Sequence, residues 1–195
     1  MINACYQRPR SSLFNLPFVA LVGIAIMSAM PVAAAVYHSR ESALELAFGS
    51  AAQVVPQELF LLGKDQVNAA RLAGSEIPSR LIQRYEGYVS GQLVGYAYFE
   101  THTVRSLPET LMIVLDPTGR VAAVHVLAFH EPETYMPHEG FLRQFDGRVL
   151  DSELSLRTGI QGVAGSTFTA NAVTAAVRRV LAVHQTLAGQ TGESD

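Results

Sequence analysis

The chain contains almost no cysteine. Its only one, Cys5, lies ahead of an apolar N-terminal segment, so the region after that segment has no disulfide, no reactive thiol and no cysteine-based metal or iron–sulfur site. Basic residues are also scarce, with 14 Lys and Arg against 17 Asp and Glu among 195 residues. A mildly acidic chain without a basic stripe gives no electrostatic reason to expect a nucleic-acid partner. The GxGxxG, Walker and GxSxG motifs are absent as well, which removes the usual signs of dinucleotide, P-loop and serine-hydrolase sites.

A long uncharged segment near the N-terminus indicates export. It runs over 24 residues from Leu13 to Val36, after Arg8 and Arg10, and contains the small-residue stretch that ends at Ala35. A basic flank, an apolar run and a small-x-small site are typical of a secretory signal peptide cut after residue 35. The same run is long enough to cross a bilayer if it is retained as an anchor. Both alternatives place residues 36–195, predicted to form one domain, on the outer side of the cytoplasmic membrane, where the protein is periplasmic or anchored.

The region after the apolar segment predicts an α+β domain. Short helices are expected after Ser39, which can cap RESALELAF, and over residues 65–72, where Gly74 and Pro78 should stop the second helix. Four strands are expected over 81–89, 92–104, 110–116 and 120–129, joined by Ser-Gly and Asp-Pro-Thr-Gly turns. Such short connections favour hairpins, so we predict a mainly antiparallel sheet of about four or more strands.

A long C-terminal helix is predicted from Ala170 to Leu187. Its apolar stripe, which should pack on the sheet, consists of Val173, Val177, Val180, Leu181, His184 and Leu187. Arg178, Arg179 and Gln185 lie elsewhere on the same helix. The last residues, GQTGESD, are expected to form a solvated tail.

Just before that helix lies AGSTFT, residues 164–169, with three hydroxyl side chains within four residues. By local physics this segment is a helix start, because Ser and Thr side chains accept hydrogen bonds from free backbone N–H groups and Gly165 permits a tight turn. A helix N-terminus also favours a phosphate, since its N–H donors and macrodipole attract anions. The segment therefore predicts a helix cap that could also hold a phosphate.

The segment also resembles the S/D-G-A-T-x-T pattern of the FMN-binding domain in the flavin subunits of Rnf and sodium-translocating quinone reductase complexes. Gly165, Thr167 and Thr169 match the pattern, whereas Ala164 and Ser166 depart from its commonest residues. The preceding block, residues 126–148, is similar to the family's polar, Pro-containing loop that leads to Gln-Phe-x-Gly. The resemblance covers roughly residue 81 to the final helix.

The resemblance implies a covalent flavin cofactor. It makes Thr169 the hydroxyl that is esterified by the phosphate of FMN, and the site would include Gly165, Ser166, Thr167 and Phe168. His130, Glu131 and Tyr135 are the expected neighbours of the flavin ring. The implied partners are a flavin transferase for maturation and membrane-associated redox proteins.

Three functions remain open on the sequence. The first is an exported electron carrier with FMN on Thr169, acting between a membrane-associated donor and an acceptor. The second is an exported flavin-dependent reductase in which residues 131–139 gate a small substrate. The third is a non-catalytic exported binding module whose Ser/Thr run only caps a helix.

Two histidines and four tyrosines allow more than one functional interpretation. His130 and His138 could ligate a metal, but Pro132 and Pro137 prevent one continuous helix from aligning them, and no HExxH is present, so no metal site is predicted. The tyrosines at 85, 88, 96 and 98 lie on predicted strands, where cross-strand aromatic pairs stabilise a sheet. A role for these tyrosines in electron transfer is the alternative.

Overall fold

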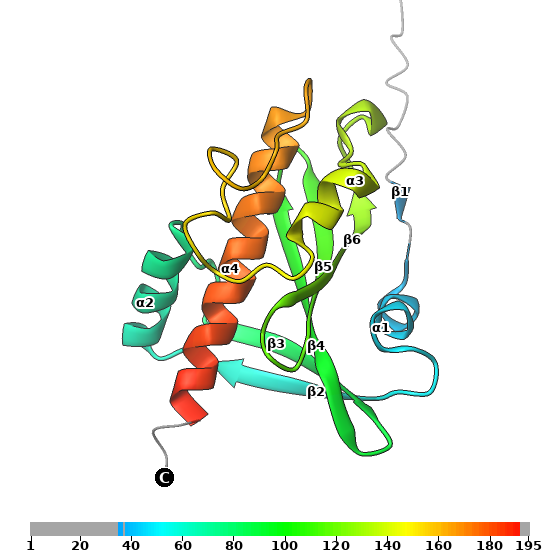
Figure 1. The fold of residues 1–195 in the computed structure, drawn as a ribbon, viewed down its shortest axis with the longest axis vertical. Helices are drawn as coiled ribbons and strands as arrows, with labels where there is room; N and C mark the ends of the chain where they lie inside the picture. The colour runs from blue at the N-terminus through cyan, green and yellow to red at the C-terminus, as the bar shows by residue number, and fades with distance from the viewer. Residues whose placement is uncertain (1–34, 37, 192–195) are drawn as a thin grey trace, which may run out of the picture. The chain divides into compact units, whose positions relative to one another are not determined.

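This computed structural model describes residues 35–36 and 38–191. They form an antiparallel sheet with helices on both faces (Figure 1). These residues belong to one structural unit, Val32–Asp195. The strands are β1 (Ala35–Val36), β2 (Gln53–Phe60), β3 (Leu81–Val89), β4 (Gln92–Thr103), β5 (Pro108–Leu115) and β6 (Val121–Phe129). The helices are α1 (Arg40–Phe48), α2 (Gly63–Ala73), α3 (Glu139–Leu142) and α4 (Thr167–Thr191), with 3₁₀ turns η1 (Glu133–Tyr135) and η2 (Arg143–Phe145).

The sheet is a meander, with spatial order β1-β6-β5-β4-β3-β2 and all neighbours antiparallel. The four predicted strands are confirmed as β3 to β6, and so is the predicted hairpin at Ser90-Gly91. Ser90 and Gly91 both have positive φ, 51° and 77°, which is the conformation of a two-residue turn that follows the twist of its strands. The predicted antiparallel α+β architecture is therefore correct.

The strand β2 has no counterpart among the predicted elements. Its sequence, QVVPQELF, contains Pro56, which has no N–H to donate to a neighbouring strand. A proline is tolerated at the edge of a sheet, and β2 is the edge strand beside β3. Edge position thus explains why a proline-interrupted run still forms a strand.

The two short helices begin and end close to the predicted residues. Ser39 caps α1 by accepting a hydrogen bond from the Ser42 N–H at 3.2 Å, and α2 ends at Gly74 in the left-handed conformation. α1 packs against one face of the sheet through Phe48. A Cβ atom at Gly87 would come within 2.5 Å of the Phe48 ring, so only glycine allows this close approach.

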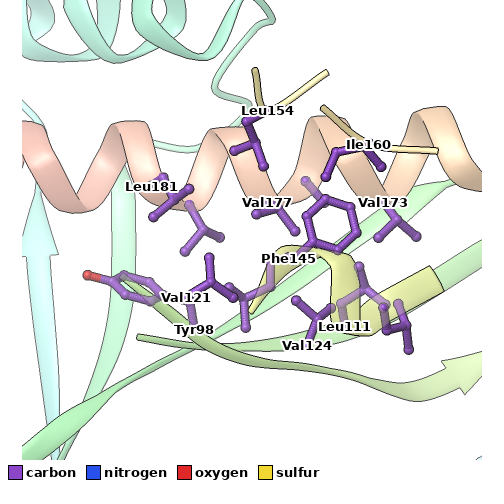
Figure 2. Close-up of a cluster of buried hydrophobic side chains, with 14 of the residues drawn as sticks. Tyr98, Leu111, Val121, Val124, Phe145, Leu154, Ile160, Val173, Val177 and Leu181 are labelled. Carbon is purple, nitrogen blue, oxygen red and sulfur yellow. The ribbon is translucent and has the colours of Figure 1, made fainter. Parts of the chain in front are cut away.

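The main core lies on the other face, between the sheet and α4. Figure 2 shows side chains from α4, β4, β5 and β6 pointing toward one another around Phe145 of η2. The α4 stripe is buried as predicted at Val173, Val177, Val180, Leu181 and Leu187. This burial anchors α4 over its length and so sets the position of its first turn.

The two α4 arginines make tertiary contacts that its apolar stripe did not indicate. Arg178 donates to the backbone carbonyls of Leu72 and Ala73 at the end of α2 and to those of Asp151 and Leu154. Arg179 forms a partly buried ion pair with Glu100 of β4 at 2.5 Å. Both residues therefore fasten α4 to its neighbours.

A closed polar network lies under the C-terminal half of α4. Tyr98 Oη is 2.9 Å from His184 Nδ1, and the Tyr96 ring packs against the His184 ring at 4.7 Å between centroids. Arg84 lies over Tyr96 and pairs with Glu86 at 2.5 Å. Burial raises the pKa of Tyr98 and lowers the pKa of His184 to about 4, so both side chains are neutral at pH 7.

Candidate functional site

The first turn of α4 begins three residues earlier than predicted. Gly165 has φ 81° and lets the chain turn, and the Ser166 N–H donates to the Val163 carbonyl at 3.1 Å. The helix then starts at Thr167, so Thr169 lies within its first turn. The first N–H groups of an α-helix have no partner within the helix, which leaves donors and a positive partial charge at this end.

Two hydroxyl groups of this segment contact the η1 segment. Thr169 Oγ1 donates to the carbonyl of Tyr135 at 2.7 Å, and Ser166 Oγ is 3.5 Å from the carbonyl of Thr134. Thr169 is only 1% exposed, whereas Thr167 and Phe168 face solvent. The hydroxyls therefore join the start of α4 to the loop that follows β6.

Glu131 holds the turn between β4 and β5. Its Oε1 accepts hydrogen bonds from the N–H groups of Arg105, Ser106 and Leu107 at 3.2, 2.7 and 2.9 Å. The backbone N–H groups of Ser106 and Leu107 are the main causes that hold the pKa of this buried carboxyl below its ordinary value. The carboxylate is thus engaged in fixing the 104–107 turn.

Arg105, at the tip of that turn, lies between two aromatic rings. Its Cζ is 5.2 Å from the Tyr135 ring centroid and 5.4 Å from the Phe168 ring centroid. The three side chains come from the β4–β5 turn, from η1 and from the first turn of α4. Together they bring a cation and two aromatic faces to one place.

These residues line a surface hollow of about 550 Å³. Its walls are Val104, Arg105, Ser106, Glu131, Pro132, Tyr135 and Phe168. Thr169 lies directly beside it, because it bonds to Tyr135 and follows Phe168. A volume of this size falls in the range of small-molecule sites, roughly 300–1,000 Å³.

The structure brings most of the predicted site residues to this one end of the molecule. Phe168, Glu131 and Tyr135 line the hollow, and Ser166 and Thr169 bond to its η1 wall. Gly165 and Thr167 flank the same helix start and are exposed.

His130 is placed differently. Its Nδ1 lies 3.0 Å from the carbonyl of Pro108, so its ring is directed toward the start of β5 and does not line the hollow.

Four residues that line this hollow were not singled out by the sequence as site residues, namely Val104, Arg105, Ser106 and Pro132, and Arg105 is the charged one among them. It lies in the short connection between two predicted strands, where an isolated cation gives no functional signal. Only the position of the connection at a hairpin tip could have drawn attention to it, because such tips often carry function. Its proximity to Tyr135 and Phe168 depends on the sheet register and on α4 packing.

Two further features of the described residues bear on cofactors and membranes. No group of three or more His, Cys, Asp or Glu side chains in residues 38–189 is placed to hold a metal ion. Nor does any helix of the described region have the length and apolarity needed to cross a bilayer. The apolar segment from Leu13 and the cleavage site after Ala35 lie almost entirely outside the described residues.

In comparison with known proteins, no protein-family model and no curated sequence matches this chain.

Proposed function

We propose that this chain is an exported electron-transfer flavoprotein that carries FMN esterified to Thr169. The observation that supports the proposal most is that the Thr169 hydroxyl, in the first turn of a 25-residue helix, lies beside a hollow lined by Arg105, Tyr135 and Phe168. Helix N-termini stabilise phosphate groups, aromatic side chains stack on flat rings, and a cation attracts the negative charge that a flavin ring gains on reduction. When bound, FMN supplies the electron-transfer chemistry.

The residues around Thr169 can hold an FMN ester if the hydrogen bond between Thr169 and the Tyr135 carbonyl is broken. Thr169 Oγ1 is buried beneath the Tyr135 carbonyl and donates its proton to that oxygen. An esterified oxygen has no proton to donate, so the hydrogen bond to Tyr135 must be given up when the flavin is attached. The η1 segment therefore has to withdraw from α4 for a flavin transferase to reach the hydroxyl.

The chain's own residues have distinct tasks in this function. Thr169 tethers the cofactor, and the first turn of α4 offers N–H donors to its phosphate. Glu131 fixes the β4–β5 turn and so positions Arg105 at the hollow. Phe168 and Tyr135 present aromatic faces there.

A covalent tether has a physical advantage outside the cytoplasm. Holding a cofactor at nanomolar strength takes about 12 kcal/mol, and dilution still removes it where free flavin is scarce. An ester bond to Thr169 prevents that loss. The electron donor proposed here is membrane-associated, in keeping with the apolar segment expected to direct or anchor the domain outside.

The deciding experiment tests whether flavin stays attached to the chain after denaturation. The full-length chain is co-expressed with a flavin transferase, denatured and run on a gel, where flavin fluorescence should stay with the polypeptide. Thr169→Val should abolish the fluorescence, whereas the matched variant Thr167→Val, at an exposed position two residues away, should retain it. Loss of the label in Thr167→Val alone would make Thr167 the acceptor.

A colourless wild-type band would reject the flavoprotein proposal and leave the binding-module function. A flavin-labelled chain that turns over a small substrate in steady state would instead favour the reductase.

A further inference from the structure

Arg105 lies in the turn between β4 and β5, and its side chain reaches two other elements. The β4–β5 turn carries it to a gap between the Tyr135 ring of η1 and the Phe168 ring of α4, at 5.2 and 5.4 Å from the two centroids. Phe168 is 63% exposed, so much of its ring is open to solvent beside the Arg105 guanidinium. The cation and the exposed ring thus line the hollow together.

The charge of Arg105 is not neutralised by a carboxylate contact. Among the described residues no ion pair includes Arg105. The nearest acid along the hollow, Glu131, uses its Oε1 on three backbone N–H groups of the turn. Glu131 therefore sets the position of Arg105 through the main chain and leaves the guanidinium free to act on a ligand.

The contacts of Arg105 with the two rings are weak enough to be exchanged. A guanidinium over an aromatic face at an exposed site gains about 0.5–1 kcal/mol. The guanidinium is planar and remains charged, so it can stack on a flat ring or donate hydrogen bonds to its oxygen and nitrogen atoms. A planar aromatic ligand that gains negative charge suits a hollow with this lining.

We propose that Arg105 recognises the isoalloxazine ring of the flavin and that its positive charge favours the reduced, negatively charged form. The inference rests on the proposed function, and it adds a residue that sets the reduction potential. The ring lies against Phe168 and Tyr135, and Arg105 exchanges its contacts with these side chains for contacts with the ring. Charge close to a flavin ring is one of the means by which a protein sets its potential.

The test compares three variants of the full-length, flavin-loaded chain. Arg105→Met keeps the length of the side chain and removes its charge, and Arg105→Lys keeps the charge without the planar group. Arg157→Met is the matched control, because Arg157 is also exposed and does not line the hollow. Reduction potentials are measured at pH 7 by equilibration with a reference dye during titration with dithionite.

Arg105→Met should shift the ratio of reduced to oxidised flavin about tenfold toward the oxidised form, which lowers a two-electron potential by about 30 mV. Arg105→Lys should keep most of the wild-type potential, and Arg157→Met should keep all of it. An unchanged potential in Arg105→Met with the flavin still attached would overturn this inference and leave the proposed function standing. A wild-type chain without flavin would overturn both.

A second measurement applies if Arg105→Met fails to take up the tethered flavin. Free riboflavin and free FMN are titrated into the full-length chain prepared without the transferase, and quenching of flavin fluorescence reports binding. Recognition of the ring predicts that Arg105→Met weakens both ligands about fivefold. Weaker binding of FMN alone would show that Arg105 contacts the phosphate. Unchanged binding of both ligands would show that Arg105 contacts neither the phosphate nor the ring. Either result overturns the inference.

Discussion

Under the C-terminal half of α4, Arg84, Tyr98 and His184 form a closed network of polar and aromatic side chains. The first turn of the same helix instead faces a hollow lined by Arg105, which pairs with no carboxylate among the described residues. In the closed region each of these side chains contacts another ring or a charged partner. In the open region Arg105 and Phe168 are exposed and line the hollow. The difference indicates that one end of α4 holds the sheet in place and the other is available to a ligand.

The largest difference between the regions should appear when one phenylalanine is removed from each. Phe145 is fully buried beneath α4, so Phe145→Ala should lower the free energy of unfolding by about 3–5 kcal/mol. Phe168→Ala removes an exposed ring and its contact with Arg105, and should cost about 1 kcal/mol or less. Chemical denaturation of both variants measures the contrast, and equal losses would show that the open end is part of the core.

The closed region should respond to acid through His184. Burial is the main cause of its lowered pKa, the charge of Arg84 acts in the same direction, and Asp116 opposes them. The unfolded chain takes up a proton near pH 6.5 while the folded chain does so only near 4, so stability is complete above pH 6.5 and falls between these values. Because His184 keeps some solvent contact, the loss from pH 7 to pH 5 should be about 1–2 kcal/mol.

Urea denaturation at pH 7 and pH 5 measures this loss in the wild-type chain and in His184→Asn. The variant keeps a group that can bond to Tyr98 but does not titrate. An equal fall in stability in both proteins would assign the acid sensitivity to other residues.

At the open end, the contact between α4 and η1 should contribute less. Thr169→Val in the chain without flavin removes the hydrogen bond to the Tyr135 carbonyl and should cost about 1 kcal/mol. The amides of Tyr135 and Met136, whose bonds close the η1 turn, should exchange faster. Thr167→Val serves as the control, because Thr167 is exposed; a similar effect there would mean that the η1 contact has no special part.

The smallest effect on overall stability is expected from Glu131→Gln. Loss of the charge weakens the three hydrogen bonds to the β4–β5 turn, so the amides of Arg105, Ser106 and Leu107 should exchange faster with deuterium. The midpoint of thermal unfolding should stay close to that of the wild type, since only the turn is loosened. Glu133→Gln, an exposed acid two residues away, should change neither quantity. Unchanged amide exchange in Glu131→Gln would mean that the conformation of the turn does not depend on the charge of Glu131.

Much of the fold could be predicted because its signals are local. The caps at Ser39 and Gly74 and the turn at Ser90-Gly91 act on residues a few positions away, and each ends or begins an element where expected. The strand containing Pro56 could not be predicted in this way. Whether a proline is tolerated in a strand depends on its place at the edge of the sheet, which is a property of the whole topology.

The start of α4 shows the same limit. Thr and Ser are poor helix formers in isolation, which favours a start after them at Ala170. In the folded chain Thr169 instead bonds to the η1 segment, and the helix begins at Thr167. The boundary thus lies three residues before the predicted one, and the Thr169 hydroxyl holds this first turn against η1.

By itself the sequence determined the type and order of most elements, the polar loop after β6 and the hydroxyl-rich start of the last helix, since these follow from hydrophobic period, caps and turn residues. Only the tertiary structure decided that Arg105, Tyr135 and Phe168 meet at one hollow and that Thr169 is covered by η1. The physical reason is that these residues lie far apart in the chain. They come together through the β4–β5 register and through the burial of α4 on the sheet, which no local pattern encodes.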